Sequence, residues 1–171
     1  MKKNSRLILG IDPGTALVGW GLVSQQGNRL SMLAHGCIKN PPQMPQSERL
    51  LRIYTQMTEI LAKYEPDVAA VEQLFFSKNV TTGISVAQAR GVILLTAIQA
   101  GVTLAEYRPD QIKTSVCGYG RADKKQVQLM VKRLLGLQEI IKSDDTADAL
   151  ATAICHAQSS ILDRVKIKAG K

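Results

Sequence analysis

The sequence predicts an α/β protein built on a five-stranded mixed sheet flanked by helices. Short apolar runs bounded by turn residues alternate with longer segments that carry an apolar stripe, in the order β-β-β-α-β-α-β-α-α-α. The first three strands are joined by short turns, as in an antiparallel meander, whereas the later strands are separated by helices, as in parallel sheets. The 171 residues suit one domain with a sizeable core.

The first expected strand, Leu7–Ile11, ends at a carboxylate. It is continuously apolar, which is typical of a strand buried on both faces, and Pro13-Gly14 turns the chain directly after Asp12. Open sheets place their binding sites at the ends of central strands. A buried carboxylate needs a positive partner, such as a metal ion, Lys or Arg. Asp12 is therefore either part of a site or a turn residue that caps the next backbone N–H.

The segments up to residue 64 complete the meander and begin the crossover. Residues 18–23 and 30–38 are expected strands, separated by a hairpin turn at 25–28. After a Pro-rich loop, Ser47 is a good N-cap for a helix that ends near Tyr64. A helix in this place allows the following strand to lie parallel to the first.

A second expected strand end also carries an acid. Val68–Val71 is a short buried strand that ends at Glu72, and the polar loop Gln73–Gly83 follows. If this strand is a parallel neighbour of the first, Asp12 and Glu72 lie at the same edge of the sheet.

The second half of the chain is mostly helical. The remaining elements are expected to be a helix over 84–100, a strand over 102–107 and helices over 109–116, 126–135 and about 143–160. We expect a single domain over 1–160, followed by a mobile basic tail over 161–171.

The charge balance points to a polyanionic partner. Net charge is +8, which makes nucleic acid the first candidate, although a basic protein without such a partner has the same composition. No apolar run reaches the roughly 18 residues of a membrane helix. Three scattered cysteines fit free thiols in a reducing cytoplasm, so we expect a cytoplasmic protein without a membrane partner.

The last helix carries acids in its first turns. Asp145 and Asp148 share a face because they are three residues apart, but taken alone this pair is explained better by stabilisation of the helix N-terminus. Asp144 could replace Asp145, since its spacing of four residues from Asp148 also brings side chains together. The inward stripe that begins at Ala149 favours Asp145, and the place of Asp144 next to Ser143 suits a cap or a partner of the helix dipole.

The four acids together predict a metal site. Carboxylates gathered in one place repel one another unless divalent cations lie between them, and hard oxygen ligands select Mg²⁺ or Mn²⁺. Two such ions about 4 Å apart stabilise the attacking and leaving oxygens of a phosphoryl displacement. A basic chain with an acidic metal site is what a nuclease needs, because Lys and Arg bind the nucleic-acid backbone that the site cuts.

Four groups of residues occur in order between about Leu7 and Gln158. They are Gly10-Ile11-Asp12-Pro13-Gly14 with Gly19-Trp20-Gly21, then Glu72-Gln73-Leu74-Phe75, then Ala87-Gln88-Ala89-Arg90-Gly91, and Asp145-Thr146-Ala147-Asp148-Ala149-Leu150-Ala151. Together they closely resemble the RuvC family of Holliday-junction resolvases. The resemblance implies a ribonuclease-H-like fold, a homodimer and two Mg²⁺ ions per subunit, for which Mn²⁺ can substitute. It also implies symmetric nicking of four-way DNA junctions in recombination and repair, beside a RuvAB-like branch-migration helicase complex.

The resemblance also assigns roles to single residues. Asp12, Glu72, Asp145 and Asp148 match the family's catalytic, metal-binding acids. Lys113 and Lys124 match basic residues near the cut phosphate, although without the resemblance either would be a solvated helix residue. Phe75 matches the aromatic that stacks at the junction, with Phe76 pointing into the fold, unless both belong to the core. The predicted DNA contacts are Phe75, Lys78, Asn79, Arg90, Lys113, Arg121, Lys124 and Lys125.

Three other functions compete with this interpretation. Gly10–Thr15 also resembles the phosphate loop of actin-like ATPases and sugar kinases, but those proteins need a second lobe with its own phosphate loop. A non-catalytic DNA-architectural protein has no need for acids on buried strand ends. A different nuclease of the same fold, such as an RNA-hybrid hydrolase, is not distinguished by the acids alone.

Overall fold

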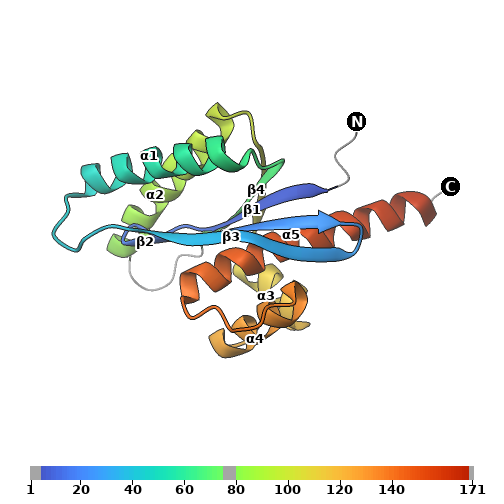
Figure 1. The fold of residues 1–171 in the computed structure, drawn as a ribbon. Helices are drawn as coiled ribbons and strands as arrows, with labels where there is room; N and C mark the ends of the chain where they lie inside the picture. The colour runs from blue at the N-terminus through green and yellow to red at the C-terminus, as the bar shows by residue number, and fades with distance from the viewer. Residues whose placement is uncertain (1–4, 75–79, 170–171) are drawn as a thin grey trace.

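A computed structural model of the chain describes residues 5–74 and 80–169. Its strands form one sheet in the order β3-β2-β1-β4-β5 (Figure 1). β1 pairs antiparallel with β2, and β2 with β3, whereas β1, β4 and β5 run parallel. The predicted mixed sheet is therefore confirmed. The strands are Arg6–Asp12 (β1), Leu17–Gln26 (β2), Arg29–Lys39 (β3), Val68–Glu72 (β4) and Thr103–Tyr107 (β5).

Helices cover both faces of this sheet. In Figure 1, α1 and α2 lie on one side of the sheet, and α3, α4 and α5 lie on the other. The order of strands and helices is the predicted one. The helices are Gln46–Tyr64 (α1), Val80–Gln99 (α2), Pro109–Cys117 (α3), Lys124–Leu135 (α4) and Asp144–Ala169 (α5).

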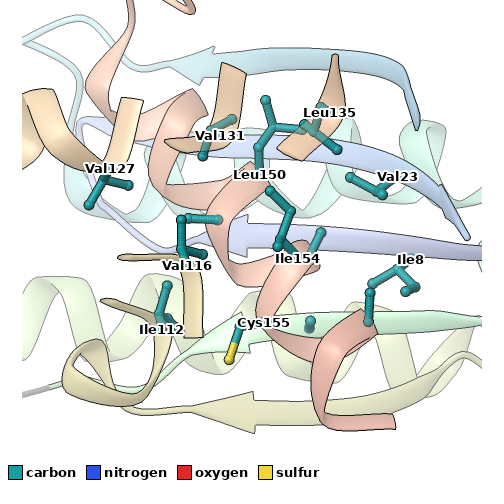
Figure 2. Close-up of a cluster of buried hydrophobic side chains, with 14 of the residues drawn as sticks. Ile8, Val23, Ile112, Val116, Val127, Val131, Leu135, Leu150, Ile154 and Cys155 are labelled. Atoms are coloured by element: carbon teal, nitrogen blue, oxygen red, sulfur yellow. The ribbon is translucent and has the colours of Figure 1, made fainter. Parts of the chain in front are cut away.

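Successive side chains of the central strand β1 point to opposite faces of the sheet and so pack in two different hydrophobic cores. Ile8 packs in the core under α3, α4 and α5, whereas its neighbour Leu9 packs in the core under α1 and α2. Figure 2 shows the first of these cores, in which Leu150 and Ile154 of α5 lie between the strands and the side chains of α3 and α4. Complete burial of each such side chain contributes roughly 1.5–3 kcal/mol, so α5 is held firmly on the sheet.

The helix starts differ from the predicted ones. α1 begins at Gln46 after Pro45, and among the described side chains none caps its first turn, so the predicted N-cap role of Ser47 is wrong. Pro45 starts the helix because its ring fixes φ near the helical value. α4 begins at Lys124 because the side chain of Asp123 accepts a hydrogen bond from Gln126 N at 2.9 Å.

The last helix is longer than expected. α5 continues to Ala169 instead of ending at about Ser160. The basic residues after Ile161 suggested a tail, but residues 161–169 contain no glycine or proline, so main-chain hydrogen bonding can continue.

Candidate active site

Asp12 and Glu72 lie side by side at one edge of the sheet. In the parallel pairing of β1 with β4, Ile11 is the Cα partner of Val71, and each acid follows one residue later. The two carboxyls share a hydrogen bond. The register of β1 and β4 therefore places both acids at the same edge of the sheet, as predicted.

Helix α5 brings the other two acids to this edge because glycines let it approach the strands closely. A Cβ on Gly19 of β2 would lie 2.0 Å from the carbonyl oxygen of Asp145. A Cβ on Gly10 of β1 would lie 1.9 Å from the carbonyl oxygen of Ala149. Only glycine fits at either position.

The carboxyls repel one another in a partly buried setting. Burial raises the pKa of Asp12 well above its usual value, and the charges of Glu72, Asp148 and Asp145 raise it further. Burial and then the charge of Asp148 raise the pKa of Glu72 to about 7. Burial also raises the pKa of Asp148. Divalent cations would relieve this repulsion.

The oxygen donors of these acids suit a hard cation. Carboxylates are the ligands that Mg²⁺ and Mn²⁺ prefer. Within residues 5–74 and 80–169, no group of three or more His, Cys, Asp or Glu side chains has the arrangement of a ready metal site.

Asp144 and Asp145 have different surroundings. The charge of Asp145 raises the pKa of Asp12, whereas the charges of both residues raise the pKa of Asp148. Asp144 instead accepts hydrogen bonds from Lys124 Nζ at 3.1 Å and Gln128 Nε2 at 2.9 Å, both on α4. The cap of α5 is Ser143, whose Oγ accepts from the amide of Thr146 at 3.4 Å. Asp144 is therefore not the cap, but its place in the first turn agrees with the alternative prediction of a partner for the helix dipole.

Two lysines stand beside the acids. Lys113 of α3 and Lys124 of α4 line a pocket of about 180 Å³ together with Glu72 and Asp148. The charge of Lys113 acts to lower the pKa of Glu72 and of Asp148. Both lysines therefore border the place where a phosphate beside these acids would lie.

Comparison with known proteins identifies the family. The family model described as "Crossover junction endodeoxyribonuclease RuvC" matches residues 8–156. This chain belongs to the RuvC family. The RuvC of Heliobacterium modesticaldum is 58% identical over 153 residues, covering 90% of this chain and 94% of that protein. The RuvC of Desulfitobacterium hafniense (strain DSM 10664 / DCB-2) is 56% identical over 160 residues, covering 93% and 97%.

A solved RuvC structure shares the fold. RuvC of Thermus thermophilus, in complex with a Holliday junction substrate, superposes with a TM-score of 0.86 at 36% identity, covering 92% of this chain and 96% of that one. The fold is therefore ribonuclease-H-like, as predicted. Membership of the RuvC family also decides against the nucleotide-binding and DNA-architectural alternatives.

A basic cleft adjoins the site of this RuvC family member. Lys113 also lines a cleft of about 710 Å³ with Arg121 and Arg108. Arg121 and the exposed Lys125 were predicted DNA contacts, whereas Arg108 was not among the predicted site residues. The feature of the sequence that could have drawn attention to Arg108 is its place directly after β5, at the same edge of the sheet as Glu72. The guanidinium of Arg108 is paired with Asp110 at 2.9 Å, and both side chains are exposed.

The other predicted DNA contacts divide into two groups. Arg90 was expected to face DNA, but its guanidinium binds the carbonyl oxygen of Glu72 and the carboxylate of Glu106. Phe75, Lys78 and Asn79, together with Phe76, lie outside the described residues, so their roles in this RuvC family member stay predictions.

Proposed function

We propose that this chain is a Mg²⁺-dependent endonuclease that resolves four-way DNA junctions by paired symmetric nicks, in homologous recombination and repair. The observation that carries the proposal is the meeting of four carboxylates at one sheet edge, with Lys113 and Lys124 beside them. The net charge of +8 suits a polyanionic substrate. Membership of the RuvC family makes the four-way junction the expected form of that substrate.

Asp12, Glu72, Asp145 and Asp148 would hold two Mg²⁺ ions per subunit, and Mn²⁺ can substitute. When bound, the ions supply a charge that stabilises the attacking and leaving oxygens of phosphodiester hydrolysis. Lys113 and Lys124 donate to the non-bridging phosphate oxygens, where negative charge grows during the reaction. The basic cleft with Arg121 holds the neighbouring backbone phosphates and so positions the cut strand.

A homodimer fits a junction that offers two equivalent strands, because a two-fold assembly presents two equivalent sites. Helix α2 carries an exposed apolar stripe at helical spacing that supports this assembly. Its side chains are Ile84, Leu95 and Ile98, which are 55%, 56% and 60% exposed. This stripe is our candidate for the dimer interface.

We also infer a RuvAB-like branch-migration helicase as a partner, on the strength of the family alone. The three cysteines are unpaired, which supports a reducing cytoplasmic setting. No helix in the described part of the chain has the length and apolar character needed to cross a membrane.

The test is cleavage of three labelled substrates: a four-way junction, a linear duplex and an RNA–DNA hybrid. Junction cutting with Mg²⁺ that disappears with chelator is the expected result. Preferential cutting of the hybrid would instead indicate a different nuclease activity. Asp12→Asn should remove cutting while junction binding in a gel shift stays near normal, because the change removes a cation ligand and leaves the basic cleft unchanged. A comparable loss of binding would count against the assigned site.

A further inference from the structure

Arg90 reaches from α2 to the strand end that carries Glu72. Its Nε donates to the carbonyl oxygen of Glu72 at 3.2 Å. Its terminal nitrogen pairs with the carboxylate of Glu106, on the neighbouring strand β5. The Arg90 side chain is only 18% exposed, so this pair is shielded from solvent more than an ordinary surface ion pair.

These contacts act on the main chain at Glu72. On the other side of the same strand end, the amide of Gln73 donates to the carbonyl oxygen of Tyr107 at 2.8 Å. The peptide that links Glu72 to Gln73 is therefore held from both α2 and β5. Arg90 binds the main-chain carbonyl oxygen of Glu72, and its charge is paired with the carboxylate of Glu106, so its contact with Glu72 bears on position rather than on the carboxylate charge.

Glu106 neutralises the charge of Arg90, so Arg90 can lie close to Glu72 without taking the place of a cation there. An uncompensated guanidinium next to Glu72 would compete with a divalent cation for the carboxylate. The pairing with Glu106 neutralises Arg90 and fixes the planar guanidinium so that Nε points at the carbonyl oxygen.

We propose that Arg90, oriented by Glu106, is a positioning residue that holds Glu72 in place for cation binding. The proposal rests on the proposed function, since it concerns the same acid site. It replaces the predicted DNA contact of Arg90 with a role through Glu72. Outer contacts of this kind typically change metal affinity or activity by about 10- to 100-fold when they are removed.

The experiment compares three variants with the native full-length protein. Arg90→Met removes both contacts, and Arg90→Lys keeps a charge for Glu106 but loses the planar donor to Glu72. Glu106→Gln keeps an acceptor while removing the charge that orients Arg90. Arg49→Met is the matched control, because Arg49 also donates to main-chain carbonyls, at Met44 (2.8 Å) and Pro41 (3.2 Å).

Mn²⁺ binding to the DNA-free protein, measured by calorimetry, is the deciding measurement. We expect about 10-fold weaker Mn²⁺ binding for Arg90→Met and Arg90→Lys. Glu106→Gln should show a smaller loss, and Arg49→Met should bind like the native protein. Junction affinity in chelator, and its dependence on salt, should be unchanged in all four, and raising Mg²⁺ should partly restore cleavage by Arg90→Lys.

Two outcomes would overturn the proposal. A weaker junction affinity with a shallower salt dependence, at unchanged Mn²⁺ affinity, would make Arg90 a DNA contact. A lower melting temperature with native Mn²⁺ affinity would make it a purely structural residue. If Arg90→Met does not fold, Arg90→Lys and Glu106→Gln decide the question. Failure of the proposed function is separate, because the native protein itself would then neither bind Mn²⁺ nor cut the junction.

Discussion

At the scale of single residues, Glu72 combines burial with a neighbouring negative charge. Its pKa is raised to about 7, mainly by burial and then by Asp148. The folded protein therefore holds this proton more tightly than the unfolded chain does, for which the ordinary value is 4.5. The stability that protonation provides is present at acid pH and is lost as pH rises from about 4.5 to about 7.

Glu72→Gln tests this effect without metal. The variant carries no charge at this position. In chelator, the native protein should lose stability as Glu72 ionises, so the variant's free energy of unfolding should increasingly exceed the native value as pH rises. We expect the gain to reach on the order of 1–3 kcal/mol at a pH of about 8. Urea unfolding of both proteins across this range gives the difference. A difference that stays flat or shrinks with pH would show that Glu72 does not carry the buried charge.

The two neighbouring acids at the start of α5 are expected to differ in function. Asp145→Asn should abolish Mg²⁺-dependent cleavage, because the charge of Asp145 acts on Asp12 and Asp145 is a proposed cation ligand. Asp144→Asn should retain activity and lose less than about 1 kcal/mol of stability, since its pairing with Lys124 is exposed and an amide oxygen can still accept. Single-turnover cleavage rates and urea unfolding measure the two effects. The opposite ranking of cleavage rates would transfer the ligand role to Asp144.

At the scale of elements, the close packing of α5 on β1 and β2 decides where its acids lie. Gly19→Ala should therefore displace the first turn of α5 and reduce cleavage strongly, because its Cβ would overlap the main chain of Asp145. We expect a loss of roughly 1–3 kcal/mol in the free energy of unfolding.

Gly91→Ala is the matched control for this substitution. Gly91 lies inside α2, and nothing in the described part of the chain is within 4 Å of its missing Cβ. Its replacement should stabilise the helix by up to about 1 kcal/mol. Thermal unfolding of the two variants settles the comparison, and equal behaviour would mean that the packing of α5 does not depend on Gly19.

At the scale of the whole molecule, the exposed stripe of α2 predicts the assembly. Leu95→Asp should convert a two-fold dimer into a monomer, because a charge in the middle of an apolar interface is left without a partner. Leu33→Asp on β3 is the control, since Leu33 is equally exposed (56%) but lies outside α2. Light scattering at micromolar concentration gives the mass. A native protein that is already monomeric would refute the dimer.

Local pattern was enough to predict the order of the elements and the acids at two strand ends. The apolar run before Asp12 and the turn after it determine a strand end from neighbouring residues alone. The same holds for Glu72 at the end of β4. The parallel pairing of these strands followed from the intervening helix, so their common edge was also predictable. The predictions of helix starts and of the end of α5 were less accurate. At the start of α5, for example, Ser143 and its neighbour Asp144 are both good capping residues, and the sequence does not choose between them.

The sequence by itself therefore determined the strand and helix order, the polyanionic character of the partner and, through its motifs, the family. The sequence already favoured Asp145 over Asp144, and only the tertiary structure decided that Asp144 binds Lys124 and Gln128, because these partners come from α4 and reach it through packing. It also decided that Arg90 binds within the protein. A lone arginine in a helix has no local signal for its partner, since Glu72 and Glu106 reach it only through the pairing of β4 with β5 under α2.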